Sequence, residues 1–499
     1  MTSDRTLTGL LQERRPTDGG QVFVRTPEGR TWSYDQIDAL AAQLTNVVRA
    51  HGVRTGDRVA VQSPNSVEWL ALHLGLLRAG AVQLPLNPAY TDAEVAALLY
   101  DAEPTLVVRD TAREVLPGPW AHLTLDASGH GSLLDEASAQ SVEADGAELS
   151  GDSPAALLYT SGTTGRPKGA LLSHGNLWHN ATTLVAAWGF GPDDVLLHML
   201  PLFHTHGLFV ATHCVLASGS SMVALPRFDA RAVVTQLPSA TVLMAVPTHY
   251  TRLLAEPDFD RDAVAGIRLF TSGSAPMTVG LHNAVTARTG HVVLERYGMT
   301  ETAMLTSNPL QGQRRPGTVG PPLPGVDVRV VDDEDIAVAL GEVGNVQVQG
   351  PNVFSGYWRR PDLRQTEFTA EGYFRTGDLG RFHPQRYLEL VGRSKDLIIS
   401  GGMNVHPKEV EEALDAIEGV AESAVIGLPD SDLGEAVVAV VVASDGAVLD
   451  AETVRHAVRD RLAGFKVPKR VYVVAALPRN AMGKVEKARI RNELSRESR

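Results

Sequence analysis

The chain of 499 residues has a single cysteine, Cys214, and no excess of positive charge. One cysteine cannot form an internal disulfide bond, which fits a reducing compartment, and it excludes a metal site built from clustered cysteines. Lys and Arg number 45 against 58 Asp and Glu, a net charge of −13. The chain therefore lacks the basic excess that attracts nucleic acids or anionic lipids, and we expect no nucleic acid partner.

Long uninterrupted apolar runs are also missing. The most apolar segment, residues 67–86, is broken by Glu68, His73 and Arg78, which predicts a core helix running into a strand and not a membrane span. The first twenty residues carry acids and arginines throughout and lack the apolar stretch of a secretory signal. We expect a cytoplasmic protein without a membrane span.

The composition, 43% hydrophobic and 21% charged, is that of a folded globular chain. Helical and strand patterns alternate up to about residue 330, which predicts an α/β fold with parallel sheets covered by helices. Short alternating strands follow, typical of an antiparallel or barrel-like section. After Arg393 a hairpin, two helices and three strands predict a compact α+β module of about a hundred residues.

The strongest motif is LLYTSGTTGRPKGALLSH, residues 157–174. An apolar strand enters a loop rich in Ser, Thr and Gly that ends at Lys168, so backbone N–H groups, hydroxyls and one cation can converge on a phosphate. The spacing of Gly162, Gly165 and Lys168 departs from the G-x4-G-K rule of the Walker loop. A flexible turn is the alternative for a glycine-rich loop taken alone.

This loop resembles the phosphate-loop signature of the adenylate-forming superfamily, which includes acyl-CoA synthetases, firefly luciferases and nonribosomal-peptide adenylation domains. Five further strings match that family in order: GSAP from Gly273, ERYGMTET from Glu295, YFRTGDLG from Tyr373, LVGRSKDLIISGGMNVHPKEVE from Leu390 and LPRNAMGKVEK from Leu477. The resemblance implies a large N-terminal domain, residues 1–393, with a β-barrel-like subdomain. It also implies a hinge near Lys395 and a small mobile C-terminal lid, residues 394–499.

The resemblance implies an enzyme that activates a carboxylic acid with ATP and Mg²⁺. Asp378 and Arg393 would meet the ribose, and Glu301 would hold the metal. Taken alone, Asp378 would be a solvated carboxylate in a short exposed turn. The implied ATP-binding residues are Thr160, Ser161, Gly162, Thr163, Thr164, Gly165, Lys168, Ser274, Ala275, Arg296, Tyr297, Gly298, Met299, Thr300, Asp378 and Arg393.

Lys484, Glu301 and Thr300 are the implied catalytic residues. By composition alone Lys484 would be a solvated surface lysine. In the family the lysine at this position closes over the site, contacts the substrate carboxylate and the α-phosphate, and offsets charge in the transition state. No general base is needed, because a carboxylate is already ionised at neutral pH.

Coenzyme A would enter in the second half-reaction, after the C-terminal domain rotates about the hinge. The resemblance assigns Gly401 and Gly402 to this step, and without a Cβ they would let the backbone approach a slender pantetheine arm. A tight hairpin turn alone would also explain both glycines.

The acyl pocket decides the substrate. The family lines it with residues that correspond here to His204, Thr205, His206, Ser272, Gly273, Met304 and Arg252. The string VPTHYTRLL, with its neighbours, closely resembles malonyl-CoA synthetases, in which the arginine at Arg252 pairs with the carboxylate that is not activated. Malonate is therefore the expected substrate, with methylmalonate tolerated. Taken alone, Arg252 would pair with Glu256 on a solvated helix face.

Three other functions share parts of this pattern. A short- or medium-chain or aryl acyl-CoA synthetase would have every ATP motif and differ at the pocket, so Arg252 discriminates it. An adenylation enzyme that loads a carrier protein would have the same chemistry with another acceptor. A binding scaffold without activity would need a broken catalytic set, whereas the sequence has Lys168, Glu301, Asp378, Arg393 and Lys484. Zinc at His204 and His206 is disfavoured because no third ligand lies at suitable spacing.

Overall fold

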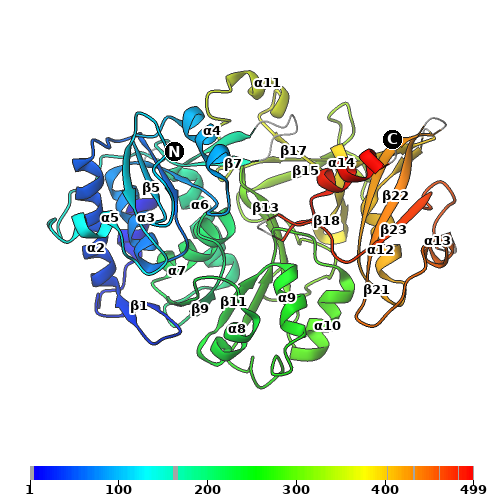
Figure 1. Ribbon diagram of the computed structural model, residues 1–499, viewed down its shortest axis with the longest axis horizontal. Coiled ribbons are helices and arrows are strands. Elements are labelled where there is room, and N and C mark those ends of the chain that lie inside the picture. The colour runs from blue at the N-terminus through cyan, green and yellow to red at the C-terminus, as the bar shows by residue number, and fades with distance from the viewer. Residues whose placement is uncertain are drawn as a thin grey trace.

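Four β-sheets organise the described part of the chain. The computed structural model describes residues 5–160, 167–401, 403–430, 433–459, 461–480 and 483–497. Figure 1 shows the N-terminal elements at one end of the molecule, the middle of the chain in its centre and the C-terminal strands at the other end. The α/β class predicted from the sequence is confirmed.

The first sheet has six strands in the order β6-β5-β3-β4-β7-β8, parallel except for the antiparallel pair β7 and β8. Its strands are β3 Arg58–Gln62, β4 Val82–Pro85, β5 Leu106–Arg109, β6 Ala121–Thr124, β7 Pro154–Thr160 and β8 Lys168–Ser173, and its helices are α2 Tyr34–Ala50, α3 Val67–Ala79, α4 Asp92–Ala102 and α5 Ser132–Ala137. The predicted core helix is confirmed as α3, which is capped by Ser66 and ends at the left-handed Gly80.

The second sheet has eight strands in the order β14-β13-β12-β11-β9-β10-β1-β2, with β2 and β14 antiparallel at its two edges. Its strands are β1 Val22–Arg25, β2 Thr31–Ser33, β9 Val195–His198, β10 Ser221–Ala224, β11 Val242–Ala245, β12 Leu269–Ser272, β13 Leu294–Met299 and β14 Ala303–Ser307. Its helices are α1 Leu7–Arg14, α6 His174–Trp188, η1 His206–Thr212, α7 His213–Ser218, α8 Ala230–Gln236, η2 Leu237–Ser239, α9 Pro247–Leu254 and α10 Val279–Thr289. Because β9, β11, β12 and β13 are parallel, the segments that follow them leave from the same edge, where ligands bind in such sheets.

The third sheet is antiparallel, in the order β15-β16-β17-β18, as the short alternating strands predicted. Its elements are β15 Asp327–Val331, β16 Gly344–Gln349, η3 Pro361–Leu363, α11 Arg364–Glu367, β17 Phe374–His383, η4 Pro384–Arg386, β18 Tyr387–Arg393 and the following turn η5 Ser394–Asp396. The long strands β17 and β18 pair Asp378 directly opposite Arg393.

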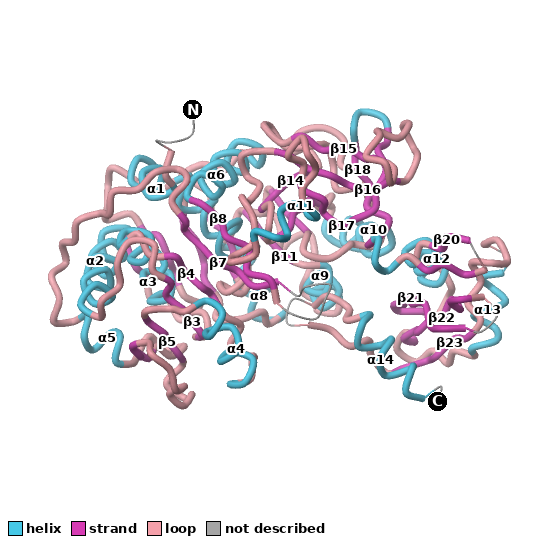
Figure 2. The backbone as a smooth tube through the Cα atoms, turned by 90° about the horizontal axis from the view of Figure 1, so that it is seen from above, coloured by secondary structure: helices cyan, strands magenta, loops and turns pink. Residues whose placement is uncertain are grey.

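The fourth sheet, in the order β20-β19-β22-β21 with β23 beside β22, follows Arg393. Its elements are β19 Ile398–Ser400, β20 Met403–Val405, α12 Pro407–Asp415, β21 Val420–Asp430, β22 Gly434–Ala443, α13 Ala451–Arg459, β23 Arg470–Val474 and α14 Lys487–Glu497. Figure 2 shows these elements gathered at one end of the molecule. Among the described residues, no helix combines the length and apolar character needed to cross a membrane.

Candidate active site

Asp378, Arg393 and Tyr297 join three of the predicted nucleotide-binding strings. The Nε atom of Arg393 lies 2.7 Å from Oδ1 of Asp378, and the hydroxyl of Tyr297 donates a hydrogen bond to Oδ2. Asp378 lies inside strand β17 and is 6% exposed, so the expected short exposed turn is wrong. The pairing of β17 with β18, and the packing of Tyr297 from β13, bury this carboxylate.

Glu301 is a second buried carboxylate, just after β13. Its Oε1 atom accepts hydrogen bonds from the hydroxyls of Thr160 and Tyr357, both at 3.1 Å. Burial raises the pKa of Glu301, and these two hydrogen bonds oppose the rise. A divalent cation would compensate the buried charge, and Mg²⁺ needs few protein ligands because it keeps several waters. The residues around Glu301 therefore fit the predicted metal position, and Tyr357 is a partner that no motif indicated.

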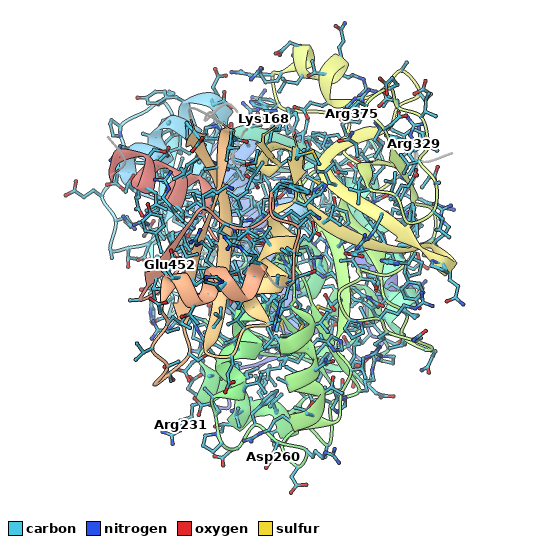
Figure 3. All side chains as sticks on the ribbon, turned by 90° about the vertical axis from the view of Figure 1, so that its right-hand side faces the viewer. Lys168, Arg231, Asp260, Arg329, Arg375 and Glu452 are labelled. Carbon is cyan, nitrogen blue, oxygen red and sulfur yellow. The ribbon has the colours of Figure 1, made fainter. Side chains whose placement is uncertain are left out.

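Lys168 begins β8 and points into the protein. Its Nζ atom lies 2.6 Å from Oε1 of Glu367, the last residue of α11, and 5.1 Å from the ring centre of Tyr357. Lys168 is 8% exposed, whereas Figure 3 shows Arg231 and Asp260 extending from the edge of the molecule. Ser161, Gly162, Thr163, Thr164 and Gly165 lie outside the described residues.

Lys484 belongs to the C-terminal part of the chain, yet its side chain lies close to the nucleotide residues. Burial and the charge of Arg393 lower its pKa, while Asp378 acts in the opposite direction. The preceding residue, Gly483, has a left-handed φ of 74°. A Cβ at that position would lie 2.7 Å from Oγ1 of Thr248 in α9, so the loop of Lys484 packs against the helix of the predicted acyl pocket.

His206, predicted to line the acyl pocket, contacts Ser274, predicted to bind ATP. Nδ1 of His206 lies 3.2 Å from Oγ of Ser274, and Ser274 has an unusual positive φ of 67°. His206 begins the π-helix η1, a rare helix form that often marks functional sites. Thr205 and Ser272, which the resemblance also places in the acyl pocket, are both buried.

Burial lowers the pKa of His204 to about 4, with smaller contributions from the charges of Arg296 and Lys484. Both cations therefore act on the same imidazole. Gly298 and Met304 meet across the antiparallel pair β13 and β14, because a Cβ at Gly298 would lie 2.4 Å from Cε of Met304.

Arg252 does not join this group directly. Its side chain is exposed on α9, and its guanidinium carbon lies 6.0 Å from the ring centre of Phe228, which stacks on His249 with the ring centres 3.9 Å apart. The expected alternative, an Arg252–Glu256 ion pair, is not formed in the described part of the chain. His249 links Arg252 to His206 electrostatically. Burial is the main cause that lowers the pKa of His249 to about 4, and the charge of Arg252 contributes to the same shift. His249 in turn contributes to the lowered pKa of His206.

The remaining predicted residues lie at the edges of the site. Ala275, Met299 and Thr300 are half-buried, and the backbone N–H of Met299 donates to Oγ1 of Thr302 over 3.2 Å. Gly401 is exposed in the hairpin of β19 and β20, where its φ of 59° is left-handed and its N–H donates to the carbonyl of Leu433. Gly402 lies outside the described residues.

The glycine-rich string that ends at Lys168, the Asp378–Arg393 ion pair and Lys484 from the C-terminal part match the pattern expected of an AMP-binding enzyme. The model of the AMP-binding enzyme family matches residues 12–358, and that of its C-terminal domain matches residues 409–484. The chain belongs to this family.

Individual relatives cover almost the whole chain. A malonate–CoA ligase of Arabidopsis thaliana is 34% identical, covering 94% of this chain and 85% of its own. An indoleacetate–CoA ligase of Aromatoleum aromaticum is 36% identical, covering 99% of each chain. ATP-bound MatB from Rhodopseudomonas palustris is 46% identical with a TM-score of 0.95, covering 99% of this chain and 100% of its own. The apo structure of the same MatB, at the same identity and coverage, has a TM-score of 0.83.

Proposed function

We propose that this chain is an AMP-forming malonate–CoA ligase. It joins malonate to coenzyme A through an acyl adenylate and releases AMP and pyrophosphate. The observation that carries the proposal is that the charge of Lys484 acts on His204 of the acyl pocket, while the charges of the ion-paired Asp378 and Arg393 act on Lys484. The similar malonate–CoA ligase and MatB favour malonate as the acid.

In the first half-reaction, Asp378 and Arg393 hold the ribose hydroxyls of ATP, and the segment from Tyr297 to Met299 contacts the adenine. A carboxylate oxygen of malonate attacks the α-phosphorus, and the bond from phosphorus to pyrophosphate breaks. Lys484 offsets the negative charge that develops there. Mg²⁺, held by Glu301, would supply further positive charge on the phosphates. The other proposed nucleotide contacts are Thr160, Ser161, Gly162, Thr163, Thr164, Gly165, Lys168, Ser274, Ala275 and Thr300.

In the second half-reaction, the sulfur of coenzyme A attacks the acyl carbonyl carbon, and the bond from that carbon to AMP breaks. We propose that residues 394–499 rotate as a unit against residues 1–393 for this step, bringing Gly401 and Gly402 to the pantetheine arm. Separate cores support such a division, because the buried clusters of the fourth sheet contain only residues from Ile398 onward. The buried residues of the other clusters all lie at or before Leu388 in the sequence.

The proposed acyl pocket is lined by His204, Thr205, His206, Ser272, Gly273 and Met304, with Arg252 at its outer side. A charged acid tail would be favoured there and methylmalonate would be tolerated, whereas a fatty acid would leave the pocket cations without a partner. An aryl or medium-chain acyl-CoA synthetase is the second candidate, favoured by the similar indoleacetate–CoA ligase.

A substrate panel tests the proposed function. Malonate, methylmalonate, acetate, butyrate, octanoate and indoleacetate are each supplied with ATP, Mg²⁺ and coenzyme A, and AMP release is measured. Malonate is expected to have the highest kcat/KM. Better turnover of any monocarboxylate would overturn malonate as the substrate, and acylation of a carrier protein but not of free coenzyme A would indicate the carrier-loading alternative.

We also propose that the enzyme works in the cytoplasm. The proposal is supported by its single cysteine, Cys214, which is free and cannot form an internal disulfide bond, as fits a reducing compartment.

A further inference from the structure

Strand β18 lies at the edge of the third sheet, so one side of its backbone has no neighbouring strand among the described residues. At Leu388 this side is closed by a loop, because its carbonyl accepts from the N–H of Val319 and its N–H donates to the carbonyl of Gly320. Backbone groups of alternate residues in a strand point to the same side. The carbonyl of Leu390 therefore faces the same edge, where it needs a donor from another part of the chain or from solvent.

That donor is Lys408, the second residue of helix α12. Its Nζ atom donates to the carbonyl oxygen of Leu390, and its side chain is only 21% exposed. Helix α12 contacts β18, and both can be followed in Figure 1. Leu390 belongs to residues 1–393, whereas Lys408 belongs to residues 394–499. The hydrogen bond therefore joins the two parts that the proposed function moves against each other.

Lys408 is poorly placed to stabilise its own helix. A cation in the first turn of a helix lies at the positive end of the helix dipole, where an anion is favoured. Glu412, one turn later, lies 3.8 Å from Nζ, but it is 57% exposed, and a lysine that precedes its acid is the less favourable order. Lys487 differs, because it pairs with Glu411 at 2.6 Å inside residues 394–499. The contacts of Lys408 therefore point across to the N-terminal part.

Two carboxyl groups of the N-terminal part interact electrostatically with Lys408. Burial raises the pKa of Glu295 in β13 to about 8, and the charge of Lys408 opposes this rise. Burial also acts to raise the pKa of Glu389 in β18, but hydrogen bonds from β17 and a smaller contribution from Lys408 lower it overall. The ammonium group thus lies near two acids of residues 1–393 in addition to the edge carbonyl.

We propose that Lys408 is a positioning residue for the first half-reaction. Its hydrogen bond to the edge of β18 holds residues 394–499 in the arrangement that brings Lys484 close to the nucleotide residues, and it breaks when these residues rotate for the second half-reaction. Lys408 acts through Lys484. The inference rests on the proposed function and adds a residue to which the family resemblance assigned no role.

Lys408→Met tests the assignment, because methionine keeps an unbranched side chain without the ammonium group. Malonate-dependent pyrophosphate exchange should fall by about tenfold or more, as the loss of one hydrogen bond from a charged donor allows. Formation of malonyl-CoA from synthetic malonyl adenylate should be unchanged or faster. Lys408→Arg keeps a charged donor and should retain most of the exchange.

Lys487→Met is the matched control. Lys487 is 23% exposed, close to the value for Lys408, and it also binds α12, but its partner Glu411 lies within residues 394–499. Its loss should leave both half-reactions unchanged. A loss of exchange as large as that in Lys408→Met would mean that any lysine bound to α12 has this effect, and would overturn the specific role of Lys408.

A disulfide lock provides a readout that general damage to the fold would not change. A Cβ at Gly483 would lie 3.5 Å from Cβ of Thr248 in α9, a separation that a disulfide bond spans. Thr248→Cys combined with Gly483→Cys should therefore cross-link the present arrangement when oxidised with oxidised glutathione, and the chain's own Cys214 is buried. In this oxidised background Lys408→Met should no longer lower pyrophosphate exchange. Reduction with dithiothreitol should restore the difference.

The outcomes separate this inference from the proposed function. Unchanged exchange in Lys408→Met, equal losses in both half-reactions, or a loss that the oxidised lock does not reverse would each overturn the positioning role. A wild type that exchanges pyrophosphate with another acid and not with malonate contradicts the proposed function, and the same variants measured with that acid still decide the role of Lys408. An oxidised lock that forms malonyl-CoA as fast as its reduced form contradicts the rotation, and this inference with it.

Discussion

Lys168 and Glu367 form a part-buried ion pair, with Nζ 2.6 Å from Oε1, at the end of the predicted phosphate loop. The two residues lie 199 positions apart in the sequence. Phosphate oxygens and the Glu367 carboxylate would compete for the same ammonium group. The pair therefore holds the lysine in place and at the same time opposes the anion it is proposed to bind.

Substitution of Lys168 and substitution of Glu367 should change ATP binding in opposite directions. Lys168→Met removes the cation and should raise the KM for ATP by about tenfold or more. Glu367→Gln removes the competing charge and should lower that KM by a few-fold, since an ion pair with a partly exposed member contributes about 1 kcal/mol. Steady-state kinetics at saturating malonate measures both. A raised KM in Glu367→Gln would mean that the carboxylate positions Lys168 instead of competing for it.

Lys484→Ala should abolish the first half-reaction selectively. We expect malonate-dependent pyrophosphate exchange to fall by about 100- to 1000-fold, while thioester formation from synthetic malonyl adenylate is retained. Because burial lowers the pKa of Lys484, its charged form is lost at a lower pH than for an ordinary lysine, and wild-type exchange should decline early on the alkaline side. Lys487→Ala, which removes a partner of Glu411, is the control and should leave exchange unchanged.

Local patterns in the sequence predicted the elements but not the environment of each side chain. The helix at residues 67–79 and the hairpin strands at 398–405 follow from apolar period and turn residues, and both are confirmed. Burial of Asp378 depends on Tyr297, 81 positions away, which no local pattern contains. Arg296 and Tyr297 are adjacent in one string, yet strand alternation directs them to opposite faces. Glu367 lies in none of the motifs.

The buried imidazoles of His73, His174 and His213 should make the fold sensitive to acid. Burial lowers the pKa of His73 and of His174 to about 4, from 6.5 when exposed. Between these values the unfolded chain binds more protons, so the free energy of unfolding should fall as pH falls from about 6.5 to about 4. His174→Leu should flatten this dependence in thermal or urea unfolding, whereas the exposed control His130→Leu should not. An unchanged slope in His174→Leu would remove this imidazole from the explanation.

Ser394→Pro tests the proposed rotation of residues 394–499. The preceding Arg393 is extended, with φ −101° and ψ 139°, the conformation that a following proline requires, and Ser394 begins the short helical turn η5, where proline is tolerated. The substitution therefore fits the present arrangement and restricts others. The chain has a TM-score of 0.95 to ATP-bound MatB and 0.83 to apo MatB, so those two structures of the relative differ from each other.

Pyrophosphate exchange should consequently survive in Ser394→Pro, since it needs Lys484 where it now lies. Formation of malonyl-CoA should fall by about tenfold or more, because about 1.4 kcal/mol of added resistance to rotation gives that factor. Ser394→Ala, which leaves the backbone unrestricted, should retain both activities. Equal losses in the two half-reactions of Ser394→Pro would mean that the substitution damages the site itself, and that the second half-reaction needs no turn at this position.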